Sequence, residues 1–529
     1  MSEKQHSFII PDDQSISALV SLLQKTFSVR VQAETVFHRV FYDTFDWRLT
    51  KNGSTLEMHD DGLSHRIYWR ADKDSKLKIQ LGLRKVPRLA GDLPACKFRQ
   101  QLQSVISVRE LLPRIKIRIK RQSLAVLDKN EKVVVRLNLD VYWYSPSRLR
   151  AAKVLAKRLT IKAVKGYAKD YQRVDAFFVD VQLPKPLPKP LQSAQDNVLK
   201  LALIASGVST GDYTTSLNFR LDPDMPDEQA LKYILLRLLE IMQQNTAGSI
   251  KGRDTEFMHD YRVAIRKIRV VLKQLNHLHP QAVSAEYKRF FSRLCKLSNP
   301  VRDLDVFLMQ LENYKPDFEK SGWQELQPLR DYLLLLRAEA QNKLIEELKS
   351  SQYRKTIKQW RDYLGHSATE NDATDKSGKA VYELADELLW DINQQTLKQG
   401  KTITENSDAE TLHNLRKTFK QLRYMTVFFS SLYPAVELRV LIQTLIDVQD
   451  NLGVFNDRHM QLNMVKAFIK QSKNKEAIKA SEQIIKILEQ QQLEAGKSFK
   501  DSYRVYASSG RQKKFKEMFV DYRRGKMKL

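Results

Sequence analysis

One basic helical pattern occurs twice in this chain, and this duplication constrains the fold more than any other feature. In the first copy, basic side chains recur every three or four residues among apolar ones, at His259, Arg262, Arg266, Arg269 and Lys273. At 3.6 residues per turn, these five positions fall within an arc of about 80°. The segment contains no glycine or proline. It therefore predicts a helix with one basic face and one apolar face.

The second copy repeats the first three offsets of this pattern, at His413, Arg416, Lys420 and Arg423. Each copy is followed by an aspartate 44 residues after its histidine, and these aspartates are Asp303 and Asp457. The histidines and the aspartates are thus both separated by 154 residues. Two elements that recur at one internal distance indicate a duplication.

The two halves of the chain predict different folds. Residues 1–180 contain short β-rich runs between turn-forming segments, which favours an antiparallel barrel or sandwich, and 177–183 is expected to be its last strand. From residue 227 onward, helical stretches alternate with short polar segments, as in antiparallel helix bundles. Among the expected helices are 284–297, 302–313, 434–451 and 456–472. We therefore expect an α+β multidomain chain with a β domain at 1–220, a linker at 221–229, a helical domain at 230–510 (repeats at about 230–380 and 381–510) and a basic tail at 511–529.

Composition limits the class of partner. The chain has 42% hydrophobic and 29% charged residues and a net charge of +27, as in a globular protein that attracts polyanions. Nucleic acid, phosphate polymers, nucleotides and acidic membrane surfaces are all negatively charged partners of this kind. The two cysteines, Cys96 and Cys295, lack metal-ligand spacing and predict reduced thiols. With no signal-peptide pattern and no apolar run that could span a bilayer, we expect a cytoplasmic protein without membrane insertion.

The duplicated motif resembles a known family. The segments TEFMHDYRVAIRKIR and LHNLRKTFKQLRY, each with its later aspartate, are similar to the two repeats of the CHAD domain, a conserved-histidine α-helical domain, over about residues 227–510. This resemblance implies two pseudo-symmetric four-helix bundles around a basic cleft that binds inorganic polyphosphate. It also implies an association with polyphosphate granules.

Rows of cations suit a phosphate chain because an arginine fork can engage two phosphate oxygens and a helix holds the row rigid. Asp303 and Asp457 are expected to be structural, holding nearby arginines or capping the next helix. No catalytic residue, metal ligand or cofactor is expected. The primary candidates for polyphosphate binding are His259, Arg262, Arg266, Arg269, Lys273, His413, Arg416, Lys420 and Arg423, and the secondary ones are Lys267, Lys417, Arg289, Arg293, Lys296 and Arg302.

The N-terminal half resembles a second family over about residues 1–215. The segment VFYDTFDWRLTKNGSTLEMHDDG is similar to part of the CYTH, or triphosphate tunnel, fold, which implies an eight-stranded antiparallel tunnel that binds triphosphate and divalent metal. The family's E-x-E-x-K signature is missing, since only Glu3 and Lys4 occur there, in the wrong order. Its L-R-x-R strand is replaced by LEMH at 56–59, and its paired glutamates are absent. The domain is therefore expected to be degenerate, and the sequence argues against phosphohydrolase activity.

One strand of this half has two interpretations. Arg114, Lys116, Arg118 and Lys120 alternate with apolar residues and so share one face. That face is either a solvated outer surface over an apolar core or a polar tunnel lining.

Three functions follow from these patterns. Non-catalytic polyphosphate binding has the most support, because the basic rows are paired. The alternative is a metal-dependent triphosphatase in the N-terminal half. The third is nucleic-acid binding, which the net charge permits although we find no nucleic-acid-binding motif.

Overall fold

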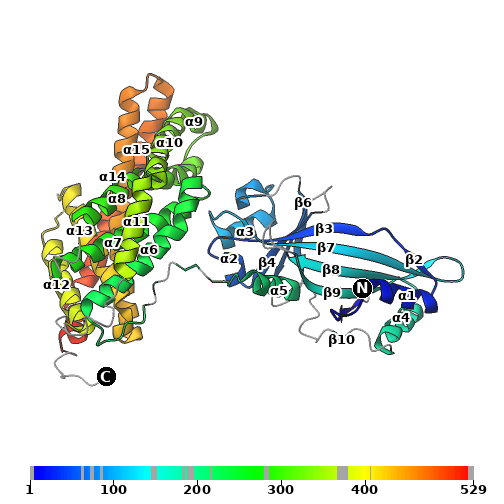
Figure 1. Cartoon of the computed structure of the whole chain (residues 1–529). Coiled ribbons are helices and arrows are strands. Elements are labelled where there is room, and N and C mark those ends of the chain that lie inside the picture. Colours follow the sequence, from blue (N-terminus) through cyan, green and yellow to red (C-terminus); the bar gives the residue numbers. More distant parts are fainter. Residues whose placement is uncertain are drawn as a thin grey trace. The chain divides into compact units, whose positions relative to one another are not determined.

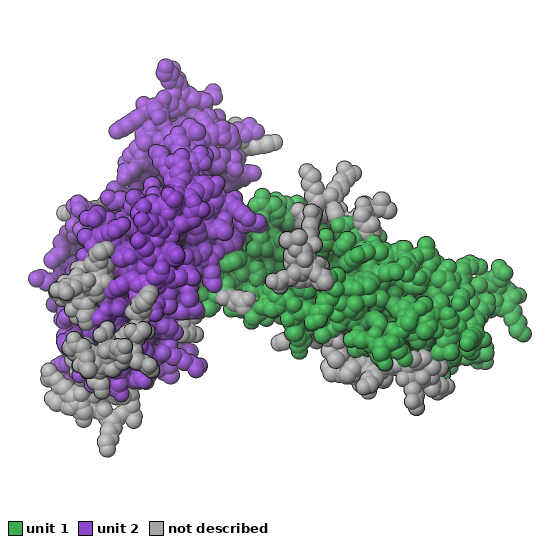
Figure 2. Space-filling model, viewed as in Figure 1, with its two compact units in different colours: residues 1–214 green, residues 215–529 purple. Residues whose placement is uncertain are grey.

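The chain divides into two compact units, residues 1–214 and 215–529 (Figure 2). The computed structural model describes residues 5–60, 65–71, 77–83, 87–144, 152–180, 185–186, 196–211, 213–214, 217, 219–278, 285–365, 379–404 and 407–521.

The N-terminal unit is built on one antiparallel sheet of ten strands (Figure 1). The order is β10-β1-β9-β8-β7-β3-β4-β5-β6, with β2 also paired to β7. The expected antiparallel β domain is confirmed. The strands are β1 Gln5–Ile10, β2 Val29–Val31, β3 Thr35–Asp43, β4 Ser54–Asp60, β5 His65–Ala71, β6 Leu77–Leu83, β7 Leu112–Leu127, β8 Val133–Tyr144, β9 Lys153–Ala163 and β10 Lys185–Pro186.

Strand β7 decides between the two interpretations of its basic residues. Ile115, Ile117 and Ile119 are buried and belong to a cluster that also contains residues of helix α5 (Asp196–Ser206). On the opposite face, Lys116 and Arg118 are exposed. The solvated outer face is therefore confirmed.

The expected strand at 177–183 is wrong for its described part. Residues 168–180 form helix α4 (Ala168–Asp180), and residues 181–183 lie outside the described residues. Tyr171, Val174 and Phe178 are buried against the sheet at helical spacing, so the 3.6-residue period overrides the β propensity of FFVDV. The other helices of this unit are α1 Ile16–Thr26, α2 Arg48–Lys51 and α3 Lys97–Ile106.

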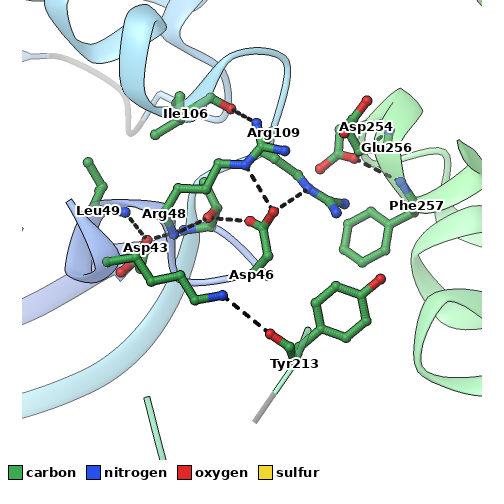
Figure 3. A network of polar contacts seen from close by, with 12 residues as sticks. Asp43, Asp46, Arg48, Leu49, Ile106, Arg109, Tyr213, Asp254, Glu256 and Phe257 are labelled. Carbon is green, nitrogen blue, oxygen red and sulfur yellow. Dashed lines mark hydrogen bonds and ion pairs between the residues drawn. The ribbon is translucent and has the colours of Figure 1, made fainter. Parts of the chain in front are cut away.

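Carboxylates fix the turn that follows β3. Asp43 Oδ1 accepts a hydrogen bond from the backbone N–H of Leu49 at 2.9 Å. Asp46 Oδ2 accepts one from Arg48 Nε at 2.9 Å and lies 3.4 Å from Arg109 Nε (Figure 3). The segment that resembles the tunnel family thus uses these acids to hold its own backbone and side chains.

Two ion pairs neutralise charge inside the sheet. Glu57 on β4 is paired with Arg39 on β3, and both are buried. Arg121 on β7 donates two hydrogen bonds to Asp140 on β8, at 2.7 and 2.8 Å. Burial alone would raise the pKa of Glu57, but Arg39 and His59 together outweigh it and lower the pKa to about 2.

The C-terminal unit is helical throughout its regular structure. Helices α6 and α12 begin 154 residues apart, at Asp227 and Val381, and so do α7 and α13, at Thr255 and Ala409. The duplication therefore extends to the positions at which these helices begin. The α-helices of this unit are α6 Asp227–Lys251, α7 Thr255–Leu278, α8 Ala285–Leu311, α9 Lys320–Glu325, α10 Gln327–Lys349, α11 Ser351–Gly365, α12 Val381–Lys401, α13 Ala409–Phe428, α14 Ala435–Gln471, α15 Lys475–Tyr506 and α16 Ser509–Lys516.

Two pairs of expected helices are single helices. The expected helices 284–297 and 302–313 form one continuous α8, which passes through Pro300, and 434–451 and 456–472 form one continuous α14. Buried residues on both sides of each break, such as Cys295 and Val301 in α8, pack into the core and hold the helix through it. In α8, this packing compensates for the backbone hydrogen bond that Pro300 cannot make.

Local signals fix the ends of the helices. Asp254 Oδ1 accepts hydrogen bonds from the backbone N–H groups of Glu256 and Phe257, at 3.0 and 3.1 Å, and so caps the start of α7 (Figure 3).

At the far end of the chain, Phe515 and Phe519 are buried, so the first part of the expected basic tail packs against the helices. Residues 522–529 of that tail lie outside the described residues. In the described part, no helix is both long enough and apolar enough to cross a membrane.

We predict that Glu57→Gln destabilises the N-terminal unit, because it leaves Arg39 buried without its counter-charge. The expected loss in the free energy of unfolding is about 3 kcal/mol at pH 7. In the native chain, the contribution of Glu57 is present above its ordinary pKa of 4.5 and is lost as the pH falls toward 2. Calorimetry of the full chain from pH 7 to 3 measures both effects.

The matched control is Glu34→Gln, because Glu34 makes an exposed ion pair with Lys120. That change should alter stability by less than about 0.5 kcal/mol. Equal losses from the two substitutions would contradict a stabilising role for the buried pair.

Candidate functional site

Four helices of the C-terminal unit enclose a cleft of about 770 Å³. Helices α7 and α8 of the first repeat supply one set of lining residues, and α13 and α14 of the second repeat supply the other. The two basic helices that the sequence predicts therefore line a common cleft.

The cleft gathers most of the primary candidates. From the first repeat, His259, Arg262 and Arg266 line it. The second repeat supplies its whole row, and Arg302, a secondary candidate, also lines the cleft. The cationic or titratable candidates in the cleft are His259, Arg262, Arg266, Arg302, His413, Arg416, Lys420 and Arg423.

The other candidates lie elsewhere. Arg269 and Lys273 continue the row on α7 but are exposed and do not line the cleft. Among the secondary candidates, Lys267 lies beside the cleft, with its Nζ 5.7 Å from the ring centre of the cleft residue Tyr424. The remaining secondary candidates are exposed and lie outside the cleft lining: Lys417, Arg289, Arg293 and Lys296.

Each repeat pairs one arginine of its basic row with its aspartate. Arg262 Nη2 lies 3.4 Å from Asp303 Oδ1, and Arg416 Nη2 lies 3.7 Å from Asp457 Oδ1. Arg262 Nε also donates a hydrogen bond of 2.8 Å to Asn299 Oδ1. These contacts can orient the two arginines toward the cleft.

The two histidines differ because the residue before each aspartate differs. His413 Nδ1 lies 2.8 Å from Asn456 Oδ1, whereas Arg302 holds the equivalent position in the first repeat. Burial, followed by the charge of Arg302, lowers the pKa of His259 to about 4. Burial lowers the pKa of His413 as well, but its bond to Asn456 opposes this shift. His259 is therefore neutral at physiological pH.

Lys420 is the most perturbed cation of the cleft. Burial and the charges of Arg266, Arg416 and Arg262 lower its pKa from 10.5 to about 5. Burial, with Arg423 next in size, lowers the pKa of Lys267 to about 8. Burial together with these neighbouring positive charges thus leaves one lysine without its proton at neutral pH.

Several arginine donors in the cleft lack acceptors. The Nε–H groups of Arg266, Arg416 and Arg423 and the Nη1 group of Arg302 are buried and have no hydrogen-bond partner among the described residues. Buried donors in native proteins are almost always paired. This arrangement is therefore suited to an anion with many acceptor oxygens.

Some cleft residues were not predicted. Asn299 and Asn456 orient Arg262 and His413, and both precede an aspartate of the motif, so these aspartates were the available signal. Val306, Met460 and Met464 also line the cleft, and no pattern in the sequence separates them from core residues.

The described carboxylates form no cluster suited to a metal ion. In the part of the chain that the structure describes, no group of three or more His, Cys, Asp or Glu side chains could hold a metal ion. In the N-terminal sheet, the carboxylates of Glu57 and Asp140 are bound to arginines instead.

Comparison with known proteins finds a family match in the helical unit. Residues 233–466, which span most of α6 through α14, match the family model of the CHAD domain. The chain carries a CHAD domain. A match that starts in α6 and ends in α14 includes all four helices that line the cleft. No curated protein sequence matches the chain.

Solved structures resemble each half separately. The CHAD domain from the plant Ricinus communis is 24% identical, with a TM-score of 0.46, over 53% of this chain and 91% of that one. PptA from Streptomyces chartreusis is 12% identical, with a TM-score of 0.42, over 53% of this chain and 100% of that one. A Hippeastrum protein, described as a putative adenylyl cyclase with a dominant triphosphatase activity, is 11% identical, with a TM-score of 0.25, over 36% of this chain and 91% of that one.

We predict that Lys420→Met stabilises the protein at pH 7. Because the folded state lowers the pKa of Lys420, the unfolded chain binds the proton more tightly, and this lysine opposes folding below pH 10.5. The expected gain in the free energy of unfolding is about 1–3 kcal/mol. It should be smaller at pH 9 than at pH 6, as thermal unfolding at each pH will measure.

Lys417→Met on the same helix is the control, since Lys417 is exposed and outside the cleft. It should change stability by less than about 0.5 kcal/mol at either pH. A lower unfolding temperature for Lys420→Met would show that the charges of the cleft do not repel one another as described.

Proposed function

We propose that the CHAD domain binds inorganic polyphosphate in this cleft, without catalysis. The observation that carries the proposal is the convergence of two duplicated basic rows on one cleft, with buried guanidinium donors that have no acceptor among the described residues. The same proposal includes a cytoplasmic location, at polyphosphate granules.

The chemistry of the ligand matches that of the cleft. A condensed phosphate chain offers anionic oxygens along its whole length, and each arginine fork can engage two of them. Arg262 and Arg416 are held by the aspartates of their repeats, so part of their orientation exists before the ligand binds. Preorganised donors reduce the entropy lost on binding.

The cleft is less suited to single-stranded nucleic acid. Proteins that bind it without sequence preference stack successive bases on aromatic rings. Tyr424 is the one aromatic side chain among the described residues that line the cleft, and it is buried. A bare phosphate chain needs no such platform.

The N-terminal sheet gives no support to the triphosphatase alternative. A divalent metal needs carboxylate oxygens that are available for coordination. Glu57 is paired with Arg39 and Asp140 with Arg121, so their carboxylates are already neutralised. We therefore place phosphate binding in the helical unit.

The decisive experiment compares two double variants of the full chain. Arg266→Gln with Lys420→Met removes two cations from the cleft. Arg269→Gln with Lys417→Met removes two exposed cations from the same two helices, outside the cleft. Affinity for long-chain polyphosphate is measured by calorimetric titration, with single-stranded DNA as a competitor.

We expect the cleft variant to lose at least about 30-fold in affinity, since each charge-assisted hydrogen bond is worth about 1.5–3 kcal/mol. The control should lose less than about threefold. Equal losses in the two variants would show that net charge, and not the cleft, attracts the ligand. Effective competition by DNA of matched charge would favour the nucleic-acid function instead.

A further inference from the structure

The cleft has an apolar part that inorganic polyphosphate cannot use. Val306, Val454, Met460 and Met464 line the same cleft as the arginines. The side chains of Val454 and Met460 are 39% exposed, so they are not part of a closed core. A ligand made only of phosphate would leave this apolar surface in water.

The apolar residues lie on the same helix faces as the polar residues that line the cleft. On α14, Gly453, Asp457, Met460 and Met464 follow at intervals of three or four residues and so share one helix face. At 1.5 Å per residue, this face runs about 16 Å from Gly453 to Met464. Its character changes from acidic to apolar within one turn after Asp457.

The first repeat shows the same change at the equivalent place. Val306 lies three residues after Asp303 on α8, as Met460 lies three residues after Asp457 on α14. Val306 and Met460 are thus related by the 154-residue duplication, and both line the cleft. Each wall therefore has an apolar residue one turn beyond its arginine-bound aspartate, and Val454 adds another one turn before Asp457.

A polar contact joins the two walls beside this apolar part. Gln310 Oε1 on α8 accepts a hydrogen bond of 2.6 Å from Arg458 Nη1 on α14. Gln310 also contacts Gln461, which lines the cleft. On α14, Leu462 and Val465 belong to the buried core between α8, α10 and α15. The hydrogen bonds of Gln310 and the core packing of α14 therefore hold the residues around the apolar part in place.

We infer that the cleft accepts organic polyphosphates, in which a short phosphate chain is joined to an apolar or aromatic group, as in a nucleoside polyphosphate. The phosphates lie among the arginines of α7 and α13, and the organic group lies against Val306, Val454 and Met460. This inference rests on the proposed function, because the same arginines bind the phosphates in both cases. Charge complementarity sets the orientation, since the organic group carries no charge that the arginines could bind.

The test compares two anions of similar charge, adenosine 5′-tetraphosphate and inorganic tripolyphosphate, by calorimetric titration of the full chain at one salt concentration. The nucleotide should bind at least about fivefold more tightly, because its organic group covers apolar surface. The double variant Val454→Thr with Met460→Gln should remove this preference and leave the affinity for tripolyphosphate unchanged. Both positions are exposed, so the variant should fold, as circular dichroism will verify.

Leu493→Gln with Val505→Thr is the matched control, because both residues are exposed on α15 and neither lines the cleft. It should retain the preference for the nucleotide. Equal affinity for the two anions in the native chain, or equal losses for both anions in the Met460 variant, would overturn the inference while leaving polyphosphate binding intact. If neither anion nor long-chain polyphosphate bound, the proposed function itself would fail, and the inference with it.

Discussion

Repulsion among like charges in one cleft is the constraint on which the functional part of this protein depends. Burial, with the nearby charges of Arg266, Arg416 and Arg262, lowers the pKa of Lys420 to about 5. Such crowding opposes folding, and it persists because the helices that carry the charges are held elsewhere by buried apolar contacts. An anion that enters the cleft removes the repulsion, so the destabilisation of the free protein becomes affinity for the ligand.

The rest of the helical unit keeps this cleft in shape. Helices α8 and α14 run unbroken through the positions where their cleft residues lie, and α10 and α15 share a buried core with them. Asp303 and Asp457 hold one arginine each, which limits the motion of the row and leaves other donors available. In the N-terminal sheet, by contrast, buried charge is neutralised within the protein, because Glu57 is paired with Arg39 and Asp140 with Arg121.

The sequence predicted the duplication and most of the cleft because both depend on local periodicity. A helix face follows from residue spacing, and the match of two faces at one internal distance indicated that they act together. The sequence could not show where one helix crosses another. Arg269 and Arg423 hold equivalent positions in the two repeats, yet only Arg423 lines the cleft. That difference arises from tertiary packing, as do the continuity of α8 through Pro300 and the helical state of residues 177–180.

The most direct test of this account is the number of protons taken up when the full chain binds polyphosphate. Calorimetric titrations at pH 7 in buffers of different ionisation enthalpy measure that number. The free cleft holds Lys420 and His259 neutral, with pKa values of about 5 and 4. A bound anion favours their charged forms, so we predict an uptake of about one proton or more and an affinity that rises as the pH falls from 8 to 6. Binding without proton uptake, or the absence of binding, would contradict the account.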